Sequence, residues 1–341
     1  MSAPPRSREA QRSLLARHLA GDGIELGPGH VPFPVPYPGI RVRYVDRWQP
    51  DENRALFREL GDEAPFPMPD IVCNFDTDGL RQVDDASQDF VIASHVLEHV
   101  ANPLSLLDEI HRVLRPGGVV LLLLPDRRRT FDRRRAPTPL AHVVDEHLRG
   151  ITSVDDHHVA DFLVGTDVPI PDDEGDRVAV FDLHRRRSIH VHCWQEDEFF
   201  EVLEHAVAEL AHRWELVDAV LADDEGDDGF EFGYVLRRTA ALDDAGVLAE
   251  RLRLSWQRWL ETRSWWHGCL AAGGSTAPPE PAAACERPGP GEPIDLSLPA
   301  EPPRIPTPAR PGGRGVLADI RRTTRTHAAT IAERIRRTPN V

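Results

Sequence analysis

Lysine is absent from this sequence of 341 residues, so all 40 of its basic residues are arginine. Acidic residues number 56, which gives a formal net charge of −16. Proteins that bind duplex DNA present a positive surface, because contacts to phosphates supply much of the affinity. The acidic balance therefore argues against nucleic acid as a partner. The lack of lysine also excludes a P-loop, since that motif requires a lysine.

Cysteine and long apolar runs are also scarce. The four cysteines are widely spaced and form no Cys-x-x-Cys pair, which disfavours both a zinc knuckle and a disulfide framework. The longest apolar run, residues 119–124, is too short to cross a bilayer. Residues 1–20 lack the apolar core of a secretory signal. We therefore expect no transmembrane segment and a location in a reducing cytoplasm.

Short apolar runs alternate with helical patterns up to about residue 240, which is typical of α/β proteins. A helix is predicted over residues 103–114, with Asn102 as its N-cap and Gly117-Gly118 after its end. Strands are expected at 23–26, 42–46, 71–75, 90–94 and 119–125, with two late strands at 213–221 and 230–237. This alternation predicts a parallel sheet with helices on its faces.

Changes in composition divide the chain further. We assign residues 1–20 to an N-terminal helix or arm and 21–240 to the main domain, with an inserted substrate lid at about 127–212. A helical extension is predicted at 241–272, and twelve prolines within 273–313 are typical of a linker. Residues 314–341 regain apolar residues at helical spacing, with seven arginines around them. Such a basic tail can contact a membrane surface, a partner or the acidic domain of its own chain.

A glycine motif, Glu-Leu-Gly-Pro-Gly at 25–29, follows the first predicted strand. Open α/β sheets bind ligands at the carboxyl ends of their strands, and glycines there let a ligand approach the backbone. A dinucleotide-binding fingerprint needs a third glycine at the position of Pro32, which disfavours a nicotinamide-dependent oxidoreductase. Asp46 ends the second strand, where a carboxylate can accept both hydroxyls of a ribose.

Three further motifs complete the pattern. They are Tyr-Val-Asp at 44–46, Asp-Phe-Val-Ile-Ala-Ser-His-Val-Leu-Glu-His at 89–99 and Leu-Arg-Pro-Gly-Gly at 114–118. In this order, residues 20–130 resemble class I S-adenosylmethionine-dependent methyltransferases of the methyltransferase type 11 group. The sequence is similar to a bacterial subgroup with a proline-rich loop after the glycine motif, here residues 30–38. Four prolines at alternate positions exclude a helix interior in this loop.

The resemblance implies a Rossmann-like, seven-stranded, mostly parallel sheet with an antiparallel last strand, followed by a helical or disordered C-terminal extension. It also implies S-adenosyl-L-methionine as cofactor. Glu25 would reach the amino group of the methionine moiety, Asp46 the ribose hydroxyls, and Asp76 the adenine. Ser94 and His95 would line the floor beneath the sulfonium methyl. The residues implied to bind the cofactor are Glu25, Gly27, Gly29, Asp46, Asp76, Thr77, Ser94 and His95.

Histidines are concentrated in the predicted insertion, between the strand at 119–125 and the two late strands. His190 and His192 alternate on a strand-like segment and would share one face. Such a cluster can bind a metal, supply a general base or acceptor contact, or be structural. We assign no metal ligands and take His95 or His192 as the candidate base. The candidate substrate-binding residues are Arg127, Arg129, His190, His192 and Trp194, since arginines can bind an anionic acceptor.

The predicted function is methyl transfer from S-adenosylmethionine to a small-molecule or glycan-like acceptor, by O- or N-methylation in bacterial secondary or cell-surface metabolism. Catalysis would come mainly from positioning the two reactants in a water-poor cleft. The alternative is a catalytically degenerate methyltransferase fold that acts as a binding module through a partner. The intact Glu25, Gly27, Gly29 and Asp46 weigh against that alternative.

Overall fold

A computed structural model describes residues 8–35, 38–61, 63–222, 229–240 and 243–271. The chain divides into two units, Ala3–Arg263 and a second made of Met1–Ser2 and Ser264–Val341. Within the second unit, only the helical backbone up to residue 271 is described. The linker predicted at 273–313 and the basic tail predicted at 314–341 lie outside the described residues. Everything below concerns the first unit.

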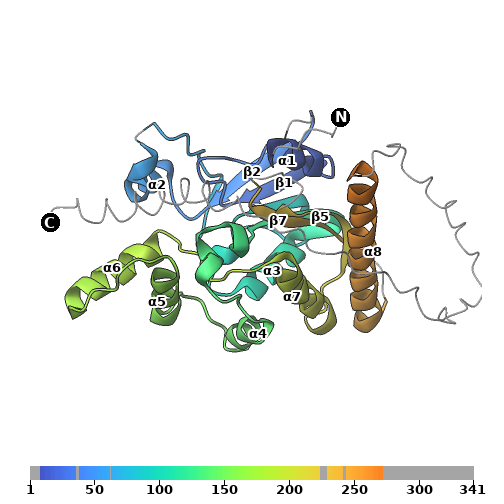
Figure 1. Ribbon diagram of the computed structural model, residues 1–341. Helices are drawn as coiled ribbons and strands as arrows, with labels where there is room; N and C mark the ends of the chain where they lie inside the picture. Colours follow the sequence, from blue (N-terminus) through green and yellow to red (C-terminus); the bar gives the residue numbers. More distant parts are fainter. Residues whose placement is uncertain (1–7, 36–37, 62, 223–228, 241–242, 272–341) are drawn as a thin grey trace, which may run out of the picture. The chain divides into compact units, whose positions relative to one another are not determined.

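Seven strands form one sheet in the order β3-β2-β1-β4-β5-β7-β6 (Figure 1). Strand β7 is antiparallel to both of its neighbours, and the pairs among β1 to β5 are parallel. The predicted fold class is therefore confirmed. The strands are β1 Asp22–Leu26, β2 Arg41–Asp46, β3 Ile71–Val72, β4 Gln88–Ser94, β5 Leu114–Pro125, β6 Trp214–Val220 and β7 Glu231–Arg238.

Helices cover both faces of the sheet. In Figure 1, α1 lies on one side and α3, α4 and α7 lie on the other. Strand residues alternate between the two cores: Val91 and Ala93 of β4 face the α3 side, whereas Phe90 and Ile92 face the α1 side. The α-helices are α1 Arg8–Ala16, α2 Pro50–Leu56, α3 Pro103–Val113, α4 Leu140–Leu148, α5 Asp156–Gly165, α6 Glu174–Arg186, α7 Glu196–Glu209 and α8 Ala245–Ala271.

Two sequence-based boundaries are corrected by the structure. Asn102 caps α3 as predicted by accepting from Ser105 N at 3.0 Å, but α3 ends at Val113, and the two glycines belong to β5. A Cβ at Gly118 would lie 3.0 Å from Asp89 O, so this glycine serves the close approach of β5 to β4. Strand β3 ends at Val72 instead of residue 75, because the chain turns where Asp78 accepts from Asn74 N.

The described residues between β1 and β2 contain no helix, as the alternating prolines predict. Phe33 is buried in this loop and packs in the core on the α1 side. The loop thereby closes over the end of β1, where a helix would otherwise begin.

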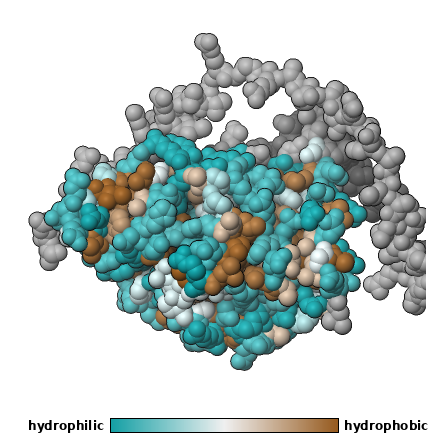
Figure 2. All heavy atoms as spheres, turned by 90° about the horizontal axis from the view of Figure 1, so that it is seen from below, coloured by the Kyte–Doolittle hydropathy of each residue, from teal (hydrophilic) through white to brown (hydrophobic). Residues whose placement is uncertain are grey.

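Among the described residues, no helix has the length and apolar character needed to span a membrane. The face shown in Figure 2 is mainly hydrophilic and carries separate hydrophobic patches. Cys73 and Cys193 are buried free thiols. The cytoplasmic location stays a prediction.

Candidate active site

The carboxyl ends of β1, β2 and β4 lie at one edge of the sheet, because the three strands are parallel and adjacent. Glu25 of β1 pairs with Tyr44 of β2 on one side and with Ile92 of β4 on the other. This register places Glu25 close to Asp46 and Ser94, which end the two neighbouring strands. The edge is where open α/β sheets bind their ligands.

Glu25 is a deeply buried acidic group on this edge, with 2% of the residue exposed. Its Oε1 accepts from Phe33 N at 2.8 Å, whereas its buried Oε2 has no hydrogen-bond partner among the described residues. Burial raises the pKa of Glu25 to about 7. An unsatisfied buried carboxylate oxygen favours a ligand that brings a hydrogen-bond donor, and an ammonium group brings a compensating charge as well.

Gly27 and Gly29 follow with left-handed backbone conformations, at φ values of +54° and +56°. Side chains rarely adopt this region, and a Cβ at Gly27 would lie 3.3 Å from Val96 Cγ2. A Cβ at Gly29 would meet nothing within 4 Å. The loop is therefore open at Gly29, whereas at Gly27 a side chain would be both strained and crowded by Val96.

Two of the three predicted acceptors on the adjacent strands lie partly buried at this edge. Asp46 Oδ1 accepts from Trp48 N at 3.2 Å, and burial raises the pKa of Asp46. Asp76 Oδ1 accepts from Ala101 N at 2.7 Å, which ties the loop after β3 to the start of α3. Thr77 is exposed, and its hydroxyl donates to Asp78. The geometry thus suits Asp46 and Asp76 better than Thr77 for holding a ligand.

His95 stands at the tip of β4 between two buried carboxylates, with a φ of +57°. Its Nε2 lies 2.7 Å from Glu231 Oε2, and its Nδ1 lies 3.4 Å from Glu98 Oε1. Burial alone lowers the pKa of His95, but the hydrogen bonds to Glu231 and Glu98 outweigh it and raise the pKa to about 9. His95 is therefore protonated at neutral pH with both nitrogens engaged, and the structure argues against it as a general base.

Glu231 is held from a second side by the N-terminal helix. Arg12 of α1 donates from Nε and Nη2 to its two oxygens at 2.8 and 2.6 Å. Burial would raise the pKa of Glu231, but Arg12 and His95 lower it to about 2. The carboxylate therefore stays ionised and links α1, β4 and β7.

Two candidate acceptor contacts lie in the interior instead of facing a ligand. His192 and Trp194 are fully buried, because the segment that carries them runs through the interior of the insertion. Trp194 Nε1 donates to Thr138 O at 3.1 Å, and its ring stacks on His192. Burial lowers the pKa of His192 to about 3, and no acceptor can reach it. The structure thus argues against His192 as base and against either residue as an acceptor contact.

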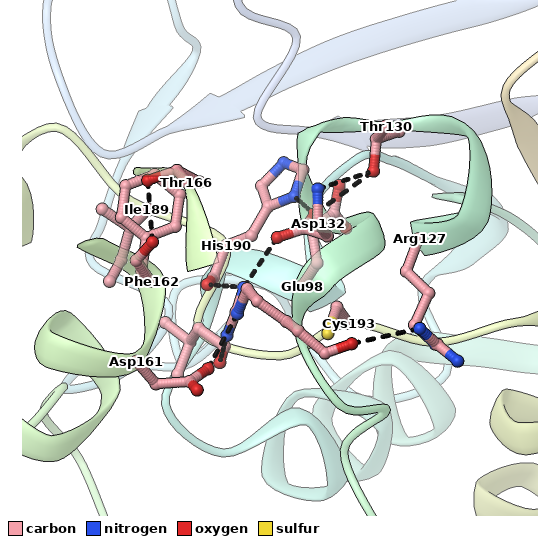
Figure 3. Close-up of polar contacts among 12 residues, drawn as sticks. Glu98, Arg127, Thr130, Asp132, Asp161, Phe162, Thr166, Ile189, His190 and Cys193 are labelled. Carbon is pink, nitrogen blue, oxygen red and sulfur yellow. Dashed lines mark hydrogen bonds and ion pairs between the residues drawn. The ribbon is translucent and has the colours of Figure 1, made fainter. Parts of the chain in front are cut away.

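The two candidate arginines support backbone instead of facing a ligand. Arg127 Nη1 donates to Arg135 O at 3.0 Å, and Arg129 Nη1 donates to Gly229 O at 3.0 Å. Figure 3 shows Arg127 directed at this backbone contact. Because both guanidinium groups donate to backbone carbonyls, the structure argues against the prediction that they recognise an anionic acceptor.

His190 is the one predicted acceptor contact that joins the strand edge. Its Nδ1 lies 2.5 Å from Asp132 Oδ2, and its ring packs against His99 with centroids 4.8 Å apart. Figure 3 shows Glu98, Asp132 and His190 side by side. Glu98 is fully buried and lies between His95 and His99, with Oε1 3.8 Å from His99 Nε2. These groups form a polar floor next to the cofactor edge.

Sequence reasoning missed several members of this floor. Glu98 and His99 lie inside the motif at 89–99. Their position just beyond Ser94 could therefore have identified them from the sequence as candidate site residues. Arg12 and Glu231 are separated by 219 positions in the sequence and carry no motif. Only folding brings them together.

Comparisons with known proteins agree with this geometry. Residues 24–122 match the family model described as a methyltransferase domain. Over 98 residues the chain is 35% identical to the thiol S-methyltransferase TMT1B of Homo sapiens, an alignment that covers 28% of this chain and 39% of the relative. The chain thus spans well under two thirds of the curated relatives it matches. It contains a methyltransferase domain, which confirms the resemblance to class I S-adenosylmethionine-dependent methyltransferases for this segment; the bacterial subgroup stays a prediction.

Solved structures give weaker likenesses. The CurJ carbon methyltransferase is 11% identical with a TM-score of 0.38, covering 69% of this chain and 56% of that one. The 1,6-didemethyltoxoflavin-N1-methyltransferase of Burkholderia thailandensis is 15% identical with a TM-score of 0.38, covering 68% and 78%. TM-scores below 0.5 support no inference about this chain.

The raised pKa of His95 predicts a pH-dependent stability. The protonated ring contributes stability that is fully present below its ordinary pKa of 6.5 and is lost as pH rises through about 9. We expect the free energy of unfolding of wild type to exceed that of His95→Gln by an amount that shrinks over this interval. Each pKa unit corresponds to about 1.4 kcal/mol.

Urea denaturation between pH 6 and pH 10 measures this difference. His30→Gln, at an exposed position in the loop after β1, is the control and should follow wild type throughout. A constant difference between wild type and His95→Gln would show that Glu98 and Glu231 do not hold a proton on His95.

Proposed function

We propose that this protein transfers a methyl group from S-adenosyl-L-methionine to a small-molecule acceptor. One observation carries the proposal: the segment that matches the methyltransferase domain, residues 24–122, contains every residue of the predicted cofactor site. The chain aligns with only part of each relative. The proposal for the whole protein therefore rests on this segment and on the geometry of the strand edge.

The residues present fit the cofactor. The buried Glu25 Oε2 meets no hydrogen-bond donor in the part of the chain that the structure describes, and the amino group of the methionine moiety would supply one. Asp46 ends β2 where a ribose would lie, and the backbone at Gly29 has open space beside it among the described residues. S-adenosylmethionine, when bound, supplies an electrophilic methyl group. The chain itself binds and orients the reactants and excludes water from the edge.

The acceptor would lie over the floor formed by Glu98, His99 and His190. His99 Nδ1 must carry its proton, because it lies 2.9 Å from the carbonyl oxygen of Ile189, which only accepts. Its Nε2 is then unprotonated, and burial lowers the pKa of His99. We infer that His99 takes the proton of the acceptor and that the neighbouring Glu98 carboxylate stabilises the imidazolium that forms.

The proposal extends to the chemical class of the methyl acceptor. The relatives named above are thiol S-methyltransferases, and a thiol is one candidate. Hydroxyl and amine acceptors, including glycan-like ones, remain the sequence-based prediction. His190 and Asp132 come from the insertion at 127–212, which lies entirely outside the matched segment 24–122, and would select among these acceptor classes.

Asp46→Asn is expected to weaken binding of S-adenosylmethionine about 10- to 100-fold, because it removes a charged hydrogen-bond acceptor worth about 1.5–3 kcal/mol. Calorimetric titration with S-adenosylmethionine and S-adenosylhomocysteine measures the change. Asp51→Asn makes the same chemical change at an exposed site on the neighbouring α2 and should bind like wild type. Absence of binding by wild type would refute the proposed function.

Glu25→Gln is expected to weaken cofactor binding while stabilising the cofactor-free protein above pH 7. The direction of this effect follows from the raised pKa of Glu25. Ionising the buried carboxyl lowers the free energy of unfolding increasingly between pH 4.5 and about 7, and the loss is constant above that. We expect the free energy of unfolding of Glu25→Gln to exceed that of wild type by about 1–3 kcal/mol. Thermal unfolding at pH 8 without cofactor measures it.

Glu63→Gln, at an exposed position, is the control for both measurements. A variant at Glu25 that loses stability and cofactor binding together would indicate a structural carboxylate instead of a ligand.

His99→Gln is expected to lower kcat about 10²- to 10⁴-fold on a hydroxyl or amine acceptor, with cofactor affinity unchanged, because a general base acts on the chemical step. Formation of S-adenosylhomocysteine over a panel of thiols, amines and hydroxyl compounds measures turnover, with His205→Gln of α7 as the control. Cofactor binding without turnover on any acceptor class would favour the binding module.

A further inference from the structure

A second histidine cluster lies inside the insertion and takes no part in the site above. His142 and Glu146 are four residues apart on α4 and therefore share one face of that helix. His158 comes from α5, and His192 comes from the extended segment before α7. The metal-binding atoms of all four side chains lie within 4.8 Å of one another.

The distances between these atoms match a common central ion. Two donors bound to zinc at about 2.05 Å with tetrahedral angles lie about 3.3 Å apart. In the structure His142 Nε2 lies 3.0 Å from His158 Nε2, and Glu146 Oε1 lies 3.3 and 3.1 Å from these two atoms. His192 Nε2 lies 3.5 Å from Glu146 Oε2.

Hydrogen bonding leaves part of this cluster unsatisfied. Glu146 Oε2 and both ring nitrogens of His192 are buried, and none meets a hydrogen-bond partner among the described residues. The exposed fractions of the Glu146 and His192 side chains are 4% and 0%. Buried polar groups without partners are costly, and two of these atoms, Glu146 Oε2 and His192 Nε2, lie 3.5 Å from each other. A bound cation would satisfy the carboxylate oxygen and the His192 Nε2 lone pair together.

Neighbouring residues hold the ligands in place. Asp155 Oδ1 lies 2.8 Å from His158 Nδ1, which leaves the Nε2 lone pair of His158 facing the cluster. Carboxylates that orient a ligating histidine in this way are a regular feature of metal sites. The Trp194 ring stacks on His192 at a centroid distance of 5.3 Å. The half-exposed side chain of His142 provides the route by which an ion would enter.

We propose that His142, Glu146, His158 and His192 bind a divalent transition-metal ion, with zinc the best fit to their nitrogen and oxygen donors. This departs from the sequence-based prediction of no metal ligands. Four protein ligands fill a tetrahedral site, which is the arrangement of a structural metal instead of a catalytic one. The ion would join α4, α5 and the segment through His192.

This placement gives the metal a defined effect on the active site. The backbone N–H groups of Val191 and His192 donate to Glu98 O at 2.7 and 3.1 Å, and Asp126 bridges to Trp194. Fixing His192 therefore fixes His190 beside Glu98 in the polar floor. The metal would order the insertion against the sheet before any acceptor binds.

Elemental analysis of the untagged full-length protein, expressed with zinc supplied, tests the proposal. We expect stoichiometric zinc, a fall in Tm when a chelator removes it, and recovery of Tm when ZnCl₂ is restored. Substitution with CoCl₂ should give the intense visible absorption of tetrahedral cobalt. A protein that holds no stoichiometric zinc and shows no change in Tm with ZnCl₂ or CoCl₂ would overturn the proposal in favour of a hydrogen-bonded histidine cluster.

Two variants locate the metal. His142→Ala removes the most exposed ligand, so the fold should survive, and it is expected to weaken zinc binding by more than about 100-fold, beyond the usual effect of an outer-shell change. His157→Ala alters the exposed histidine next to His158 and should keep wild-type affinity. With a chelator present, His142→Ala and wild type should share one Tm. Equal zinc affinity of His142→Ala and wild type would place the ion elsewhere and refute the site.

Discussion

Glu231 at the start of β7 is fully buried, and its two oxygens are shared by Arg12 of α1 and His95 at the tip of β4. An ionised carboxylate is tolerated in such a place only when cations and hydrogen bonds surround it. Removing one partner of a buried pair typically costs about 3–5 kcal/mol. This single group therefore ties the N-terminal helix and the antiparallel strand to the centre of the sheet. It also sets the charge of the histidine nearest the cofactor edge.

The same constraint extends along the edge of the sheet. Protonated His95 faces Glu98, and Glu98 in turn lies beside His99. The positive charge on His95 therefore lets Glu98 remain ionised in the interior, so that a neutral His99 has a carboxylate next to it. His95 at the tip of β4 thus acts as an electrostatic support, while His99, one turn further on, has the protonation state that a general base requires.

Much of the fold follows from local sequence, because strand and helix periodicity and capping act over a few residues. The α3 cap at Asn102 and the helix-free proline loop were predictable in this way, whereas the antiparallel β7 was implied by the family resemblance. The candidate cofactor edge could be proposed from the sequence as well, since Glu25 lies next to the end of its strand and Asp46 and Ser94 each end theirs. The ends of α3 and β3 were not predictable, because Gly118 and Asn74 are governed by neighbours on other segments.

The sequence by itself determined the order of the strands' motifs and hence which edge of the sheet carries the candidate cofactor site. Only the tertiary structure decided the states of the histidines. His192 is buried where a strand-like alternation predicted an accessible face, and His95 is charged because Glu231 comes from 136 positions away. Protonation and metal binding depend on what surrounds a side chain in three dimensions. Residues from α4, α5 and a distant loop meet around His192 only when the insertion folds.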